Sequence, residues 1–161
     1  MLYRSFKPED FDALYAIEEI CFQPPFRFGR RYLRRLIDSP NGATWIAEAD
    51  GRMTGFAVVE WTLETTEAVA YLQTIEVAPE QRGRGVASEL LQRIESSASA
   101  AGASILWLHV DATNAGAIRF YEKHGYAFYG GEDHYYAPGR GALIYRKPLL
   151  QNEGASQRRT P

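Results

Sequence analysis

A strand, a short basic loop rich in glycine and a helix follow one another in the middle of the chain. Residues 70–77 contain the apolar residues Leu72, Ile75 and Val77 and frequent β-branched side chains, and Pro79 ends the run, as expected for a β-strand. Residues 86–101 repeat apolar side chains at the period of an amphipathic helix. The loop at 82–85 reads Arg-Gly-Arg-Gly. Glycines without a Cβ, free N–H groups and the dipole of the helix N-terminus together predict a site for a phosphate.

Three phosphate-binding patterns can be compared with this loop. A P-loop needs Lys followed by Ser or Thr after its last glycine, and Val86 stands there instead. A dinucleotide loop needs a third glycine where this chain has Ser88, and it lies in the first βα turn rather than in mid-chain. The third pattern is Arg or Gln, two residues, Gly, one residue, then Gly or Ala, and Arg82–Ala87 matches it in full. A tight turn whose glycines serve geometry alone is the alternative without a ligand.

Composition excludes several broad classes of protein. The chain has 161 residues and a formal net charge of −2, and no apolar run approaches the ~18 residues that a membrane span needs. We therefore expect one globular domain without a general attraction to nucleic acid or membranes. The only cysteine, Cys21, cannot form an intrachain disulfide, and no apolar leader follows Met1, so we expect a cytoplasmic protein. The histidines have no ligand-like spacing, and no metal site is predicted.

The rest of the chain predicts strands and helices in the order β-α-α-β-β-β-α-β-α-β-β. The expected elements are strand 2–6, helices 8–22 and 30–38, strands 44–49, 54–61 and 70–77, helix 86–101, strand 104–110, helix 114–124, and strands 126–129 and 142–147. This order predicts an α/β protein whose mixed sheet has helices on both faces. Residues 150–161 contain almost no apolar side chains and are expected to form a disordered tail.

A second motif lies downstream of the glycine loop. Residues 106–126 combine a strand, Asn114 and the run Ala-Ile-x-Phe-Tyr-x-x-x-Gly-Tyr. With the loop, this stretch resembles the Gcn5-related N-acetyltransferase (GNAT) superfamily, in particular protein Nα-acetyltransferases such as the ribosomal-protein alanine acetyltransferases and the NatE-type subunits. The resemblance implies one three-layer α/β/α domain over residues 1–149. It also implies transfer of an acetyl group from acetyl-coenzyme A (acetyl-CoA).

The resemblance assigns the coenzyme to the glycine loop and its neighbours. Ile75 and Val77 would lend strand backbone groups to the acetyl carbonyl and the pantetheine arm. The residues implied to cradle the pyrophosphate are Arg82, Gly83, Arg84, Gly85, Val86, Ala87 and Ser88. Asn114 would bond the coenzyme beside the next helix, although a helix N-cap also explains this residue. Tyr121 would face the departing thiolate as a general acid, although an ordinary helix aromatic explains it as well.

Two candidates compete as the catalytic base. The triplet Leu-His-Val centred on His109 resembles the NatE-type enzymes, which also have a tyrosine at the position of Tyr71, whereas the alanine acetyltransferases place Glu in the triplet. Glu76 is the rival, since some family members use a glutamate on this strand. Simple alternation puts Tyr71 with Ile75 on one face of the strand and Glu76 on the other, unless a bulge changes the parity. A buried, hydrogen-bonded histidine is the plain alternative for His109.

The acceptor is expected to enter between the loop at 23–29 and the segment at 130–141. The candidate acceptor-binding residues are Phe22, Pro24, Pro25, Phe28, Tyr135 and Tyr136, and ordinary aromatic packing is their alternative explanation. The resemblance favours the α-amine of a protein or peptide N-terminus as the acceptor. A small-molecule amine (a polyamine, an amino acid or an aminoglycoside) and a non-catalytic acyl-CoA sensor remain alternatives. Monomer and homodimer are both open.

Overall fold

The computed structural model describes residues 1–62 and 67–150. The helices are α1 (Phe11–Cys21), α2 (Arg30–Ile37), α3 (Val86–Ala100) and α4 (Ala115–Lys123); the strands are β1 (Leu2–Ser5), β2 (Gly42–Ala49), β3 (Arg52–Thr62), β4 (Val69–Val77), β5 (Ile105–Asp111), β6 (Ala127–Ala137) and β7 (Arg140–Pro148). The predicted order of elements is confirmed. The predicted tail, apart from Leu150, lies outside the described residues. Within the described ranges, no helix has the length and apolar character that crossing a bilayer requires.

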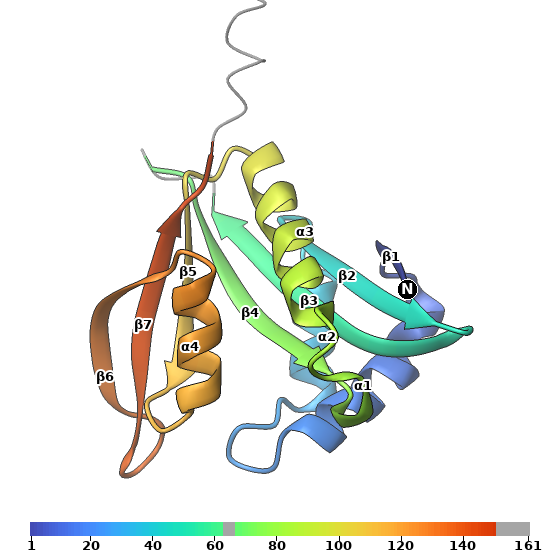
Figure 1. Ribbon diagram of the computed structural model, residues 1–161, viewed down its shortest axis with the longest axis horizontal. Coiled ribbons are helices and arrows are strands. Elements are labelled where there is room, and N and C mark those ends of the chain that lie inside the picture. The colour runs from blue at the N-terminus through green and yellow to red at the C-terminus, as the bar shows by residue number, and fades with distance from the viewer. Residues whose placement is uncertain (63–66, 151–161) are drawn as a thin grey trace, which may run out of the picture.

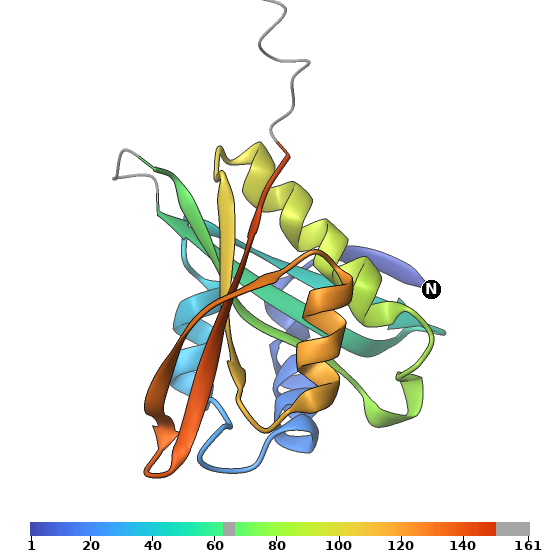
Figure 2. The ribbon, with the colours of Figure 1, turned by 60° about the vertical axis from the view of Figure 1, so that its left-hand side comes forward.

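The strands form one mixed sheet with helices on both faces. The strand order is β1-β2-β3-β4-β5-β7-β6, and β4 runs parallel to β5 while the other neighbours are antiparallel. Figures 1 and 2 show α3 and α4 on one face of the sheet and α1 and α2 on the other. The expected mixed sheet between two helical layers is therefore confirmed.

Each face of the sheet has its own apolar core, because the side chains of a strand point alternately to the two sides. On the α1/α2 side, Leu14 and Leu33 pack with Phe56 of β3. On the α3/α4 side, Leu90 of α3 packs with Leu106 of β5. All five side chains are fully buried. The central strands are thereby held from above and below.

β4 and β5 are paired only at their beginnings. Residues 69–71 pair with residues 105–107, and beyond Tyr71 β4 pairs with β3 alone while β5 pairs with β7. The two strands diverge toward their C-terminal ends, which leaves an opening between them (Figure 1). Backbone groups along one edge of β4 therefore face this opening instead of a neighbouring strand.

A bulge at Gln73 changes which side chains of β4 share a face. The pairing with β3 passes from Leu72 to Thr74 and skips Gln73, and one extra residue reverses the alternation beyond it. Leu72 packs in the α3 core, whereas Glu76 faces α1 and Tyr71 faces α2. The simple alternation that separated Tyr71 from Glu76 is therefore wrong, because the bulge brings both to the α1/α2 side.

The last two strands are longer than predicted. β6 extends to Ala137 and β7 begins at Arg140, so most of the segment 130–141 is strand rather than connecting loop. Glycine is depleted in strands, which conceals this hairpin in the sequence. Its register shifts between Phe128 and Gly130 and again after Glu132, and such irregularities bend a strand.

Candidate active site

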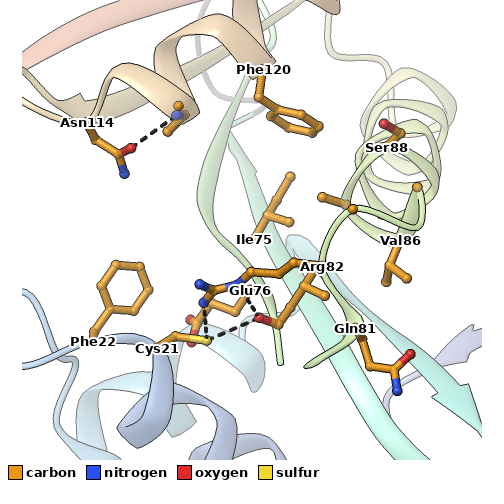
Figure 3. A pocket seen from close by; sticks show the side chains of 16 residues that line it. Cys21, Phe22, Ile75, Glu76, Gln81, Arg82, Val86, Ser88, Asn114 and Phe120 are labelled. Atoms are coloured by element: carbon orange, nitrogen blue, oxygen red, sulfur yellow. Dashed lines mark hydrogen bonds between the residues drawn. The ribbon is translucent and has the colours of Figure 1, made fainter. Parts of the chain in front are cut away.

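Two pockets meet in the opening between β4 and β5. The loop pocket, of about 600 Å³, borders the glycine loop between β4 and α3, and Figure 3 shows it from close by. The aromatic pocket, of about 650 Å³, lies between the α1–α2 loop and the β6–β7 hairpin. Both pockets share the lining residues Phe22, Ile75, Asn114 and Ala117. Molecules held in the two pockets therefore have a common meeting point at Ile75.

The loop pocket brings together most of the residues predicted to hold a pyrophosphate. Those that line it are Arg82, Gly83, Gly85, Val86, Ala87 and Ser88. Arg84 is exposed and does not line the pocket. Ile75 and Val77, predicted to contribute backbone groups, also line it.

The glycine loop has the geometry of an anion site. Gly83 and Gly85 have φ angles of 77° and 82°, in the left-handed region that favours glycine. Apart from the adjoining residues of the chain, no atom of the described residues lies within 4 Å of the position where a Cβ would stand on either glycine, so the space beside both is open. Gly85 is the N-cap of α3, whose first N–H groups have no partner within the helix. These donors and the helix dipole make the loop attractive to a phosphate.

The side chain of Arg82 fastens the loop to β4 and α1. Its Nε donates to the Val77 carbonyl at 3.0 Å, and its Nη2 lies 3.5 Å from the Cys21 sulfur (Figure 3). The Cys21 thiol also lies 3.5 Å from the Val77 carbonyl. Burial raises the pKa of the Cys21 thiol. Cys21 is therefore a protonated packing residue near neutral pH.

The backbone of β4 presents donors to the opening. The Ala78 N–H donates to the Thr54 carbonyl of β3 at 2.8 Å. Since backbone groups point alternately to the two edges of a strand, Ile75 and Val77 point away from β3. Pairing with β5 has already ended at Tyr71. The Ile75 N–H is therefore free to bond a carbonyl oxygen placed between the pockets.

Asn114 is the N-cap of α4 and lies beside both pockets. Its side-chain oxygen accepts a hydrogen bond from the Ala117 N–H at 3.1 Å, which caps α4. The plain N-cap explanation of this residue is thus confirmed, and its predicted contact with a coenzyme stays a prediction. The same cap brings the N-terminus of α4 to the opening, where Asn114 lines both pockets.

The aromatic pocket is closed by the α1–α2 loop and the β6–β7 hairpin, which are distant in sequence. Phe26 lies 4.8 Å from Tyr136 between ring centroids, and the Arg140 guanidinium stands 4.9 Å above the Phe26 ring. The predicted acceptor residues that line this pocket are Phe22, Pro25, Phe28, Tyr135 and Tyr136. Pro24 does not line it. The lining carboxylate is Asp111, which already pairs with Arg140 at 2.7 Å.

His109 is held on three sides within this pocket. Its Nδ1 lies 2.6 Å from the Tyr71 hydroxyl and its Nε2 lies 3.1 Å from a Glu132 oxygen. The Tyr135 ring stacks parallel to the imidazole, with 4.2 Å between centroids. Burial, and then hydrogen bonding to Tyr135, raise the pKa of Tyr71 well above its ordinary value. Tyr71 therefore keeps its proton near neutral pH and faces His109 as a neutral phenol.

Glu76 occupies a different environment on the same face of β4. It is 2% exposed and lies beside Glu18 of α1, which is 0% exposed. The Thr74 hydroxyl donates to one Glu76 oxygen at 2.8 Å, while the other oxygen and both Glu18 oxygens have no hydrogen-bond partner among the described residues. Burial and the neighbouring Glu18 raise the pKa of Glu76 to about 9, and burial raises that of Glu18 to about 7. A protonated carboxyl is not a base, so this environment favours His109 with Tyr71.

Tyr121 lines the aromatic pocket from α4. Its ring packs against Phe120 and Tyr126, with centroids 5.2 Å and 5.7 Å away. Burial raises the pKa of the Tyr121 hydroxyl. The phenol is therefore protonated and able to donate to a thiolate, although it is a weaker acid in this environment than a free phenol.

Three residues of the site escaped the sequence analysis. Glu132 bonds to His109 from β6, and nothing in the sequence predicts the register of that strand. Tyr32 lines the aromatic pocket and packs against Phe28 at 5.3 Å; their spacing of four residues was an available signal. Glu18 was also visible, as an acidic residue at an apolar position of α1.

The carboxyl pair predicts a pH-dependent stability. Because both pKa values lie above the ordinary value, the folded protein holds more protons than the unfolded chain between pH 5 and 9. The free energy of unfolding should therefore fall as pH rises through this window. In denaturant titrations at pH 5, 7 and 8.5, Glu18→Gln should weaken that fall by on the order of 2 kcal/mol. Glu19→Gln, a substitution at the neighbouring exposed position, is the control and should leave the fall intact. If the free energy of unfolding depended on pH equally in wild type and in Glu18→Gln, the carboxyl pair would not be the source of this dependence.

The comparisons with known proteins agree with this geometry. Residues 11–126 match the model of the Acetyltransferase (GNAT) family. Streptothricin acetyltransferase of Streptomyces lavendulae is 38% identical over 104 residues, which cover 62% of this chain and 54% of that relative. The chain thus matches about half the length of that relative. The N-alpha-acetyltransferase of Sulfurisphaera tokodaii is 26% identical over 157 residues, or 91% of this chain and 92% of the relative.

The fold has solved counterparts as well. The crystal structure of the ribosomal-protein-S18-alanine N-acetyltransferase from Escherichia coli superposes with a TM-score of 0.82 at 25% identity, over 93% of this chain and 94% of that one. The family match includes the glycine loop, Tyr71, His109 and Tyr121. The chain therefore belongs to the GNAT family of acetyltransferases.

Proposed function

We propose that this protein transfers the acetyl group of acetyl-CoA to the α-amine of a protein or peptide N-terminus, by direct attack in a ternary complex in the cytoplasm. The observation that carries the proposal is the Tyr71–His109 hydrogen bond of 2.6 Å in the aromatic pocket. The pair lies beside Ile75, where the aromatic pocket joins the loop pocket. This arrangement supports His109 as a base that would act next to a pocket that suits a pyrophosphate.

The chain supplies each group that acetyl transfer needs. The glycine loop fits a pyrophosphate, because its N–H groups and helix dipole face open space. The Ile75 N–H suits the carbonyl oxygen of a thioester and would stabilise the oxyanion that develops there. His109 with Tyr71 would take a proton from the acceptor ammonium. Tyr121 would protonate the departing thiolate, whose ordinary pKa near 8.5 is far below that of the phenol, so proton transfer is late.

The lining of the aromatic pocket supports a peptide acceptor. Aromatic rings from Phe26, Phe28 and Tyr136 suit an uncharged side chain next to the α-amine. A polycationic amine would call for several free carboxylates. Asp111, which lines this pocket, is paired with Arg140, and the nearby Glu132 carboxylate contacts His109.

A small-molecule amine is the second candidate acceptor. Its support is the 38% identity with streptothricin acetyltransferase, although the match covers little more than half of that relative. An acyl-CoA sensor without turnover is the third reading. The Tyr71–His109 bond and the pocket position of Tyr121 favour an enzyme over a sensor.

A substrate screen separates these readings. Acetyl-CoA is offered with a peptide library varied at the first two residues, with the same peptides formylated at the α-amine but carrying a free lysine, and with streptothricin and polyamines. Thiol release reports turnover, and fragmentation mass spectra locate the acetyl group. We expect turnover on free α-amines. Turnover confined to small amines would establish the second candidate, and coenzyme binding without thiol release would establish the sensor.

Replacement of Gly85 tests the coenzyme site. Gly85→Val should weaken acetyl-CoA binding at least tenfold in calorimetry, because the side chain enters the open space that a pyrophosphate would fill. Gly51→Val is the matched control, since Gly51 has a similar φ of 75° and the same open space but lies in the β2–β3 turn. It should carry the same backbone strain and bind normally. Unchanged affinity in folded Gly85→Val would place the coenzyme elsewhere.

Replacement of Tyr121 tests the general acid. Tyr121→Phe should lower kcat by about 10²- to 10⁴-fold, the usual contribution of such proton transfer, with little change in coenzyme affinity. Tyr126→Phe removes a neighbouring hydroxyl that bonds Glu95 instead, and it should leave kcat nearly unchanged. If both variants turn over within threefold of wild type, while an isotope effect shows chemistry to be rate-limiting, Tyr121 is a packing residue.

The pH profile distinguishes the two candidate bases. With His109 as base, kcat/KM should rise with pH as the imidazole loses its proton. His109→Ala should remove this limb and Glu76→Gln should keep it. Peptides with altered α-amine pKa identify any limb that belongs to the acceptor. An inactive Glu76→Gln beside a near-normal His109→Ala would reverse the assignment and reopen the small-amine reading.

A further inference from the structure

Glu132 forms the outer end of a chain of three side chains drawn from three strands. Its carboxylate on β6 contacts Nε2 of His109 on β5, and Nδ1 of His109 contacts the hydroxyl of Tyr71 on β4. The contacts measure 3.1 Å and 2.6 Å. Both ring nitrogens of His109 are thus engaged, while Tyr135 fixes the plane of the ring by stacking at an interplanar angle of 2°.

The chemistry of these partners assigns the proton on the imidazole. An ionised carboxylate only accepts hydrogen bonds, so Nε2 must carry a hydrogen to bond Glu132. A neutral imidazole then has its lone pair on Nδ1, where it accepts the hydroxyl proton of Tyr71. Burial keeps Tyr71 protonated and able to donate. The other tautomer would leave a lone pair of His109 against the Glu132 carboxylate.

We propose that Glu132 is a positioning residue, which holds His109 as the Nε2–H tautomer so that its Nδ1 can take a proton through Tyr71. This inference rests on the proposed function only in its use of His109 as the base, and it holds for a peptide or a small amine as acceptor.

In this arrangement a proton passes from the acceptor to His109 through Tyr71. An N–H bond of the acceptor ammonium breaks as that proton bonds to the Tyr71 oxygen, and the original hydroxyl proton of Tyr71 moves to Nδ1 of His109. The imidazolium so formed is neutralised by Glu132 and later releases one proton to solvent. The amine electron pair forms the new C–N bond as the thioester C–S bond breaks. A second amine proton replaces the one that Tyr121 gives to sulfur.

Among the charged groups near His109, Glu132 is the carboxylate that contacts the imidazole. Asp111 follows His109 on β5 but pairs with Arg140, and Arg27 bonds the Phe22 carbonyl at 2.9 Å. Glu60 of β3 shares a smaller pocket with His109, and burial raises its pKa. The neighbouring tyrosines are Tyr32, Tyr71, Tyr121, Tyr135 and Tyr136. Of these groups, Glu132 is the one within 3.1 Å of Nε2.

Spectroscopy tests the inference without turnover. In protein labelled with ¹⁵N-histidine, long-range ¹H–¹⁵N spectra separate protonated from bare ring nitrogens, and a His109→Gln spectrum identifies the His109 signals among the three histidines. Wild type should show Nε2–H and a bare Nδ1 at pH 8. Glu132→Ala should show a mixture of tautomers. Glu132→Gln keeps an acceptor but loses the charge, so it should keep the tautomer while its titration midpoint moves to lower pH.

Kinetics give the second arm. Glu132→Gln should lower kcat/KM at pH 7.5 by about 2- to 10-fold, as loss of a partly exposed charge contact predicts. The rising limb of the kcat/KM profile of Glu132→Gln should also move to lower pH. Glu132→Ala should lose about tenfold or more, within the 10²- to 10⁴-fold limit of general base catalysis. Asp133→Asn removes the same charge from the next position and should change neither limb nor rate.

The two arms separate failure of the inference from failure of the proposed function. A Nδ1–H tautomer in wild type, or a limb that Glu132→Gln shifts no more than Asp133→Asn, overturns the role of Glu132. Turnover confined to small amines with the expected tautomer and limb shifts supports Glu132 and rejects the peptide acceptor. A limb that survives in His109→Ala and does not follow the pKa of the acceptor amine removes His109 as the base and overturns the role of Glu132, while turnover on free α-amines would still support the proposed function.

Discussion

The site depends on the early end of pairing between β4 and β5. The two strands pair only through residues 69–71 and 105–107, and beyond Tyr71 this edge of β4 has no strand beside it in the described part of the chain. Unpaired backbone groups in a protein interior are costly unless water or a ligand bonds them. β4 nevertheless keeps its position, since β3 holds its other edge through Val77 and a core packs on each face. One structural feature thus produces an exposed row of donors and the meeting of both pockets at Ile75.

The bulge at Gln73 brings the Tyr71 phenol and the Glu76 carboxyl to one side of the sheet, where their surroundings differ. Tyr71 reaches the aromatic pocket and His109, whereas Glu76 is enclosed beneath α1 with Glu18. Burial keeps both protonated near neutral pH, but only Tyr71 has a basic partner to which its proton can move. The same desolvation therefore disfavours Glu76 as a base, although Glu76 also lines the loop pocket, and it keeps on Tyr71 the proton that the proposed relay needs.

Local patterns in the sequence predicted the elements well, and contacts between distant segments much less well. The apolar period of α3 and the positive-φ glycines of its loop are local, so the anion site could be inferred. The face of Glu76 could not, because nothing in the sequence requires the extra residue at Gln73. The contact between Glu132 and His109 could not be predicted either, because it requires the irregular register of β6. The glycines of that strand indicate a loop in the sequence. Arg84 was included by motif alone, and its side chain has turned to solvent.

The proposed base, His109, suits the weakly basic amine of the proposed acceptor. An α-amine has a pKa near 8, against about 10.4 for lysine, so presenting a neutral lysine would cost about 3.3 kcal/mol more. An imidazole titrates near 6.5 and can take a proton from the first amine far more readily than from the second. In the described lining of the aromatic pocket, Asp111 is paired with Arg140, and the nearby Glu132 carboxylate is engaged by His109, so neither carboxylate is free to attract a polycation. The electrostatics of the pocket and the strength of its base thus favour the same acceptor, an N-terminal amine flanked by an uncharged side chain.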